Sequence, residues 1–341
     1  MSDASEKPFT LSVPDAELEL LKKKLELATL PTELDEAAWD YGVPLADVKR
    51  LVDHWKNGFN WRKYEAEINK IPQFTRDIEA EGFGSLNVHY AHVRSEDEKA
   101  IPLLFVHGWP GHFMEAAKLI PLLTAVKPGE PSFHVVAPSL PAFGFSEAPK
   151  KKGFSVCNNL MIALGYKSYG GDWGYFIGRK MANVYGHKHV KAWHTNMPVA
   201  GFPSITSPFR FVSALLTMFL PPNLENLKGA QRFLEDGNAY FRIQASRTQT
   251  LAYSLRDSPI GLLAWVYEKL VAWTDSYPWT DDEVLAWVSI YWFSRGGPDA
   301  STRLYYEATH AKSGDETREQ PYSSIPLGLS FFPKEIVTLP R

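Results

Sequence analysis

The stretch Gly170-Gly171-Asp172-Trp173-Gly174 decides which fold this chain is expected to adopt. A short apolar segment precedes it, and a helical pattern follows it. Small residues around one reactive residue are typical of a sharp turn between a strand and a helix, because such a turn is too crowded to accept a Cβ at most positions. Gly-Gly-Asp also occurs in ordinary turns, so the stretch alone leaves both interpretations open.

Asp172 occupies the centre of this stretch, where the turn would display a nucleophile. A carboxylate that attacks an ester forms only an anhydride, whereas one that attacks an sp³ carbon forms an alkyl ester that water can cleave later. The residue type therefore favours opening of an epoxide or displacement of a halide over esterase or lipase chemistry.

A second segment supports this interpretation. Ile101–Val106 is a continuous apolar run of strand length, followed by His107-Gly108-Trp109-Pro110-Gly111. In the α/β-hydrolase fold, the loop after the third strand and the residue after the nucleophile each supply a backbone N–H to the oxyanion hole. These donors are expected to be the backbone N–H groups of Trp109 and Trp173. We interpret His107 as a loop residue that orients the turn rather than as a catalytic group.

Further short motifs follow one another along nearly the whole chain. They are Tyr41-Gly42-Val43, Asn60-Trp61-Arg62, Pro72-Gln73-Phe74-Thr75, the two motifs above, Asp257-Ser258-Pro259-Ile260-Gly261-Leu262, Ser301-Thr302-Arg303-Leu304-Tyr305-Tyr306-Glu307 and Phe332-Pro333-Lys334-Glu335. In this order the motifs resemble those of the microsomal-type epoxide hydrolases, especially the soluble fungal members. The resemblance implies an enzyme without a cofactor that converts an epoxide and water to a vicinal diol through an alkyl ester on Asp172.

The resemblance, together with alternating strand and helix patterns in the core, predicts the α/β class and an α/β-hydrolase fold with a helical lid and an N-terminal helical arm. The arm is expected at residues 1–95, the core at 96–199 and 310–341, and the lid at 200–309. Strands are expected around Leu86–Tyr90, at Leu103–Val106, at Phe133–Ala137, just before Gly170, at Val190–Asn196 and at Ile325–Phe332. Apolar residues at helical spacing predict helices around Leu18–Leu25, Leu45–Trp55, Leu262–Trp273 and Val284–Phe293.

Two lid tyrosines belong to the site that the resemblance implies. Ring-opening of an epoxide leaves an alkoxide unless a general acid donates to its oxygen, and a phenol stays protonated near neutral pH. The family motifs place these acids at Tyr240 and Tyr305, and the register favours Tyr305 over its neighbour Tyr306.

The resemblance also assigns the acid of a catalytic triad to Glu335 and expects a histidine base downstream of it, in a Gly-Gly-His segment. The sequence ends at Arg341, and its last histidine is His310, upstream of Glu335. We therefore expect the last strand and helix of the core to be missing together with the catalytic histidine, which places turnover in doubt. An apolar strand left unpaired at Ile325–Phe332 is expected to favour aggregation.

Composition and charge argue against several other functions. Lysine and arginine total 36 against 39 aspartates and glutamates, and they are scattered, which argues against nucleic-acid binding. The single Cys157 excludes internal disulfides, and no Cys/His cluster suggests a metal site. No stretch has the length of a membrane span and no signal peptide is present, so the chain is expected to be soluble and cytoplasmic. The sequence leaves open whether the chain forms a homodimer.

Two alternatives to the leading hypothesis follow from the same residues. A haloalkane dehalogenase also uses an aspartate at the turn and holds halide with indole N–H groups, for which Trp109 and Trp173 are suitably placed; the tyrosine pair and the N-terminal arm argue against it. A non-catalytic relative that only binds ligands beneath the lid is the second alternative. The leading hypothesis is an epoxide hydrolase of detoxification or aromatic hydrocarbon catabolism, with a small-molecule epoxide as its substrate.

Overall fold

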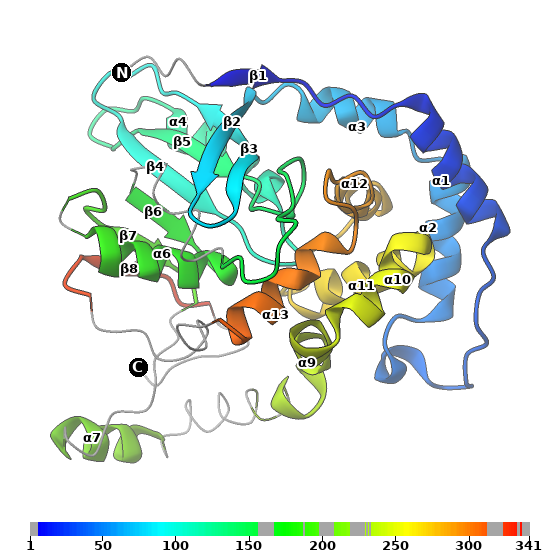
Figure 1. Ribbon diagram of the computed structural model, residues 1–341. Coiled ribbons are helices and arrows are strands. Elements are labelled where there is room, and N and C mark those ends of the chain that lie inside the picture. Colours follow the sequence, from blue (N-terminus) through cyan, green and yellow to red (C-terminus); the bar gives the residue numbers. More distant parts are fainter. Residues whose placement is uncertain are drawn as a thin grey trace.

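The computed structural model describes residues 6–155, 167–186, 188–197, 208–218, 229, 231, 233–311, 323–332 and 335 (Figure 1). The strands of this part are β1 (Lys7–Phe9), β2 (Gln73–Ala80), β3 (Gly84–Val93), β4 (Ile101–Val106), β5 (Phe133–Pro138), β6 (Lys167–Gly170), β7 (Trp193–Thr195) and β8 (Leu327–Leu329). They form one sheet in the order β1-β2-β3-β5-β4-β6-β7-β8. Pairing is antiparallel from β1 to β5 and parallel from β5 to β8.

This parallel half, with helices packed against it, confirms the predicted α/β-hydrolase fold. Two strands are shorter than the sequence predicts. β8 covers only Leu327–Leu329 of the expected Ile325–Phe332, and the preceding Pro326 has no N–H to donate to a ladder. β7 begins at Trp193 rather than at Val190, because Val190 instead makes an isolated bridge with Gly186.

The N-terminal part contributes strands to the sheet as well as helices. β1 pairs with β2, and β2 pairs with β3 along its whole length, from Gln73↔Ala91 to Ala80↔Gly84. The alternating apolar residues that predict β3 are buried, with Val88 and Tyr90 at 1% and 5% exposure. The antiparallel half of the sheet is thus built mainly from residues assigned to the arm.

The helices of the described part lie outside the sheet. They are α1 (Asp15–Leu27), α2 (Leu45–Asn57), α3 (Trp61–Ile68), α4 (Ile120–Thr124), α6 (Trp173–Tyr185), α7 (Pro208–Met218), α9 (Ala239–Ser246), α10 (Thr248–Asp257), α11 (Pro259–Ala272), α12 (Asp281–Trp292) and α13 (Arg303–Thr309). We call α9 to α13 the lid helices. Their start signals are local: Ser258 caps α11 ahead of Pro259, and Thr280 forms a capping box with Glu283 at α12. None of the described helices is both long and apolar enough to cross a bilayer.

Helices α1 to α3 run along the outer side of the lid helices (Figure 1). Polar contacts join the two groups. Asp282 of α12 accepts from the Tyr64 hydroxyl over 2.7 Å and contacts His54 Nε2 over 2.7 Å. Lys24 of α1 donates to the Asp257 carboxylate over 2.6 Å. The arm therefore holds the lid helices from outside.

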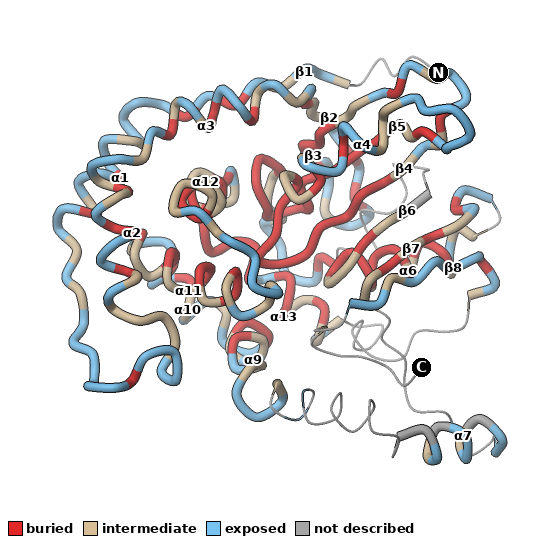
Figure 2. The backbone as a smooth tube through the Cα atoms, turned by 180° about the vertical axis from the view of Figure 1, so that it is seen from behind, coloured by how far each residue is buried: buried red, intermediate tan, exposed pale blue. Residues whose placement is uncertain are grey.

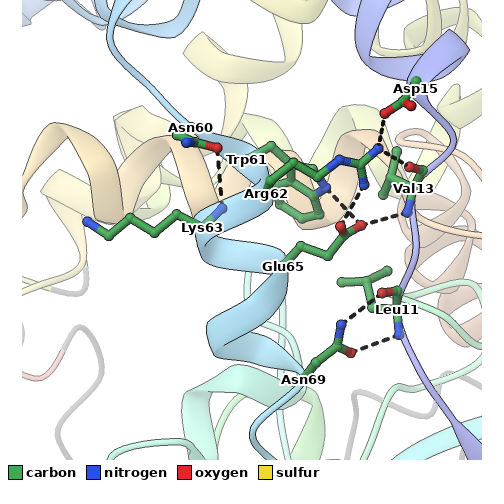
Figure 3. Close-up of polar contacts among 9 residues, drawn as sticks. All are labelled: Leu11, Val13, Asp15, Asn60, Trp61, Arg62, Lys63, Glu65 and Asn69. Atoms are coloured by element: carbon green, nitrogen blue, oxygen red, sulfur yellow. Dashed lines mark hydrogen bonds and ion pairs between the residues drawn. The ribbon is translucent and has the colours of Figure 1, made fainter.

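The extended segment before α1 is fastened to α3 (Figure 3). The Glu65 carboxylate accepts the backbone N–H of Val13 over 2.6 Å, and the Asn69 side chain exchanges two 2.8 Å hydrogen bonds with the backbone of Leu11. Asn60 caps the start of α3. Buried residues follow β3, β4 and the facing sides of the lid helices, whereas the arm exposes its outer faces (Figure 2).

Candidate active site

Asp172 stands at the sharp turn between β6 and α6. Its backbone has φ 49° and ψ −125°, a conformation that residues other than glycine rarely adopt. Close contacts explain the flanking glycines. A Cβ on Gly170 would lie 2.5 Å from the backbone of Gly174, and a Cβ on Gly174 would lie 2.2 Å from the carbonyl oxygen of Val106. The turn therefore holds Asp172 under local strain at the carboxyl end of β6.

Two backbone N–H groups hold the Asp172 carboxylate. The N–H of Trp109, in the loop after β4, donates to Asp172 Oδ1 over 2.8 Å, and the N–H of Trp173 donates to the same carboxylate. A Cβ on Gly108 would lie 2.2 Å from Asp172 Oδ1, so glycine is needed for the loop to approach this closely. The structure thus brings both expected donors onto one carboxylate.

Tyr240 of α9 and Tyr305 of α13 lie side by side, with ring centroids 5.9 Å apart. The Trp109 ring stacks on Tyr240 at 5.3 Å and meets Tyr305 edge-on at 5.9 Å. The Trp173 ring meets Tyr305 edge-on at 4.9 Å. The two expected acids therefore contact the side chains of the two residues whose backbones hold Asp172.

The hydroxyl groups of these tyrosines lie in an enclosed, apolar environment. Burial and the charge of Asp172 raise the pKa of Tyr240 well above its ordinary value. The pKa of Tyr305 is raised as well, by burial first and then by Tyr240 and Asp172. Tyr305 is 1% exposed, and its hydroxyl makes no hydrogen bond of good geometry among the described residues, although it lies close to the Tyr240 hydroxyl and the Trp173 side chain. Both phenols therefore stay protonated, and one has an unused donor.

The Asp172 carboxyl group titrates above its ordinary range. Asp172 is partly exposed as a whole residue, but its carboxyl group is enclosed, and this burial raises its pKa from 3.8 to about 6. The N–H groups of Trp109 and Trp173 act in the opposite direction, because they stabilise the charged form. The carboxylate is therefore the main form at neutral pH, and it is poorly solvated.

A second carboxyl group lies close by, on Glu115, which the sequence interpretation missed. Glu115 is partly exposed as a whole residue, but its carboxyl group is enclosed. This burial and the charge of Asp172 raise the pKa of Glu115 to about 8, while the backbone N–H of Gly108 lowers it. A Cβ on Gly111 would lie 1.5 Å from Glu115 Oε1. In the sequence, this close approach corresponds to Gly111 standing four residues before Glu115, just after the loop that holds Asp172.

The described histidines do not contact the nucleophile. His107 bridges backbone groups: its Nδ1 donates to the Gly108 carbonyl over 2.8 Å, and its Nε2 accepts the Leu140 N–H over 3.1 Å. Burial lowers the pKa of His107 to about 4, so this imidazole is neutral and orients the loop. His310 is exposed at the end of α13 and stacks on Tyr306 at 4.2 Å. None of the described histidines is hydrogen-bonded to Asp172.

Glu335 follows β8, with its backbone N–H donating to the Phe332 carbonyl over 3.3 Å. Burial raises the pKa of Tyr169, the residue before Gly170 in β6, and the charges of Glu115 and then Glu335 add to this. Glu335 therefore lies within electrostatic range of the strand that presents the nucleophile. Among the described residues, no group of histidine, cysteine, aspartate and glutamate side chains could hold a metal ion.

Comparisons with known proteins agree with this geometry. Residues 6–116 match a family model described as the epoxide hydrolase N terminus, and residues 101–242 match one for the alpha/beta hydrolase fold. Epoxide hydrolase 1 of Sus scrofa is 33% identical, over 99% of this chain and 80% of its own length. Juvenile hormone epoxide hydrolase 2 of Ctenocephalides felis is 32% identical, over 98% of this chain and 76% of its own length.

Two solved structures superpose over 99% of this chain. The epoxide hydrolase of Aspergillus niger has a TM-score of 0.82 and 33% identity, with 86% of its chain covered. The juvenile hormone epoxide hydrolase of the silkworm Bombyx mori has a TM-score of 0.87 and 29% identity, with 85% of its chain covered.

Proposed function

This chain belongs to the epoxide hydrolase family, and we propose that it opens epoxides by covalent catalysis at Asp172. One oxygen of the Asp172 carboxylate bonds to an epoxide carbon, and the ring C–O bond at that carbon breaks. The electron pair goes to the ring oxygen, which takes a proton from the tyrosine pair, Tyr240 and Tyr305. The product of this half-reaction is an alkyl ester of Asp172.

In the second half-reaction, water adds to the carbonyl carbon of that ester. Negative charge then develops on an oxygen of Asp172, where the N–H groups of Trp109 and Trp173 stabilise it. Collapse of this intermediate breaks the bond from the carbonyl carbon to the alkyl oxygen. One proton of the water passes to this alkyl oxygen, and the other returns to the tyrosine that gave up its proton in the first half-reaction. A vicinal diol leaves, and the Asp172 carboxylate and the phenol are restored.

One observation carries the proposal most strongly. The Tyr305 hydroxyl is buried against Trp109 and Trp173 and makes no hydrogen bond of good geometry among the described residues, although the Tyr240 hydroxyl and the Trp173 side chain lie close to it. A buried hydroxyl without a partner destabilises the fold by about 1–3 kcal/mol. An epoxide oxygen bound across from Asp172 would accept this hydrogen bond, and no oxygen occupies that position in a simple haloalkane.

The water-activating half of the reaction has less support in this chain. We assign the orienting acid to Glu335, because it lies within electrostatic range of β6. Among the described histidines, His107 is bonded to backbone groups, His310 stacks on Tyr306, and none is hydrogen-bonded to Asp172. We therefore propose that these 341 residues form the ester faster than they hydrolyse it.

The substrate class follows from the aromatic side chains around the tyrosine pair. Trp109, Trp173, Phe241 and Trp273 all contact Tyr240 or Tyr305. Such a lining favours apolar epoxides with aryl or long alkyl groups, the class expected of an enzyme in detoxification or aromatic hydrocarbon breakdown.

Intact-mass measurement after incubation with styrene oxide tests the proposal. We expect a lasting mass increase of one epoxide, located on the peptide that contains Asp172 and absent in Asp172→Ala. Rapid diol release without an accumulating adduct would leave the family reaction in place and contradict the slow second step. If neither an adduct nor a diol formed, the proposed chemistry would be contradicted. Halide release from 1-bromobutane would favour the dehalogenase alternative.

A further inference from the structure

Lys269 is a buried cation that the proposed reaction does not use. It lies in α11, is 7% exposed and is partly neutralised by an ion pair with Glu268. Its Nζ lies 5.0 Å from the ring centroid of Tyr240 and 5.5 Å from that of Trp273. Lysine is rarely buried in this way, because desolvation of an ammonium group is unfavourable unless a partner compensates it.

The Tyr240 ring contacts Trp109, Trp273 and Lys269 in addition to Tyr305. Trp109 stacks on it at 5.3 Å with an interplanar angle of 8°, and Trp273 meets it edge-on at 4.9 Å. Lys269 supplies the positive charge in this enclosure. A cation within about 6 Å of an aromatic face is attracted to the π system, and the attraction is stronger where water is excluded.

The ion pair with Glu268 does not cancel this effect. The Lys269 side chain is 8% exposed, whereas the Glu268 side chain is 30% exposed. The carboxylate is therefore better screened by water than the ammonium group. The ammonium group of Lys269 is the member of the pair within cation–π range of Tyr240, and Glu268 is the more solvated member.

Charge on the Tyr240 ring changes during the proposed ring-opening. As its hydroxyl donates toward the leaving oxygen, negative charge develops on the phenol, while the Asp172 carboxylate loses its charge to the new ester bond. The attraction between Lys269 and the ring therefore grows from the bound epoxide to the transition state, which is the condition for an effect on rate rather than on binding.

Building on the proposed function, we propose that Lys269 is a positioning residue for ring-opening, whose ammonium group stabilises the charge that develops on the Tyr240 phenol. Lys269 touches neither the nucleophile nor the epoxide in this scheme. It acts only through Tyr240.

A double-mutant cycle on the alkylation half-reaction tests this role. Single-turnover ester formation with styrene oxide is followed by quenched-flow intact-mass measurement in Lys269→Met, in Tyr240→Phe and in the double variant. We expect Lys269→Met to slow ester formation by about tenfold, the size of a desolvated cation–π interaction, with the apparent affinity for the epoxide unchanged. In the Tyr240→Phe background the same substitution should change the rate by less than about twofold.

Two controls separate charge from packing. Lys269→Arg keeps the cation and should recover most of the rate, whereas Lys269→Gln should behave like Lys269→Met and replaces it if the methionine variant does not fold. Equal slowing by Lys269→Met in both backgrounds, or a wild-type rate in Lys269→Met and Lys269→Gln, would overturn the role of Lys269. Absence of both an adduct and a diol with the unsubstituted protein would instead overturn the proposed function.

Discussion

Trp109 donates its backbone N–H to the Asp172 carboxylate, although 63 residues separate the two along the chain. The sheet brings them together, because β4 and β6 are parallel neighbours with Val106 opposite Gly170. The loop after β4 and the turn after β6 therefore begin side by side at the same edge of the sheet. The nucleophile and the group that stabilises it are built as one unit.

Gly108→Ala should separate the Trp109 N–H from the Asp172 carboxylate. The added Cβ would lie 2.2 Å from Asp172 Oδ1 and push the carboxylate away from its donors. We expect the single-turnover rate of ester formation to fall about 100-fold, the cost typical of displacing a reacting group by about 1 Å. Gly229→Ala is the control, because an added Cβ there meets open space. An unchanged rate in Gly108→Ala would show that the contact with Trp109 does not matter for reaction.

The rate of ester formation should depend on pH through the nucleophile. Burial raises the pKa of Asp172 to about 6, and only the ionised carboxylate attacks. We expect the rate constant to rise about tenfold per pH unit below pH 6 and to level off above it. Single-turnover measurements from pH 4.5 to 8, corrected with Asp172→Ala for uncatalysed opening, check this. A midpoint near pH 4 would contradict it.

Glu115 should make the fold less stable as pH rises. The folded-state pKa of about 8 lies above the ordinary 4.5, so stability that is fully present below pH 4.5 is lost as the pH rises to about 8. The free energy of unfolding should fall by up to about 1.4 kcal/mol per pH unit in this window. Glu115→Gln should flatten the decline, leaving the smaller slope of Asp172, whose shift has the same sign. Urea unfolding between pH 5 and 8 measures it, and Glu19→Gln, an exposed site, should leave the decline unchanged.

Tyr305→Phe should slow ring-opening without affecting the fold. The variant removes one proton donor and a buried hydroxyl that has no partner among the described residues. We expect ester formation to slow by about 10²-fold, with thermal stability equal to or above that of the unsubstituted protein. Tyr306→Phe is the matched control, since Tyr306 stacks on His310 instead. Equal slowing in both variants would mean that the register of the motif was assigned wrongly.

The edge of the sheet should contribute to self-association. β8 pairs with β7 on one side, and Leu327 and Leu329 are 44% and 41% exposed. An exposed apolar edge strand is a template for pairing with another chain. Leu329→Lys should shift size-exclusion light scattering toward monomer, whereas Leu122→Lys, at an exposed site on α4, should not. A monodisperse unsubstituted protein would show that this edge is not adhesive.

Local sequence signals predicted the features that depend on local chemistry. The turn at Asp172 and the β4 loop need glycine at fixed positions, and crowding leaves that requirement visible in the sequence. The long lid helices α11 and α12 were predicted for a similar reason, because the apolar spacing that indicates a helix is set by residues close together in the sequence.

Features that depend on distant partners were missed. β1 is three residues long and is defined by its pairing with β2, more than sixty positions later, as in Lys7↔Thr75. The length of β8 was overestimated, because apolar residues continue beyond Leu327–Leu329, the part that pairs with β7. Glu115 and Lys269 were overlooked because a charged residue in a helix is usually solvated, and only the tertiary contacts show that these two are enclosed.

The contacts between Asp282 and the arm residues His54 and Tyr64 bear on how this protein could be recombined with relatives. The arm contributes no atom to the proposed reaction, yet it holds α10, α11 and α12 from outside, and α10 packs against α9 and α13, the helices that carry both phenols. A chimaera that takes only the lid from a relative would receive the tyrosines without the surface that sets their position. The arm and the lid should therefore be exchanged together, because the segment that determines substrate preference is larger than the residues around the two tyrosines.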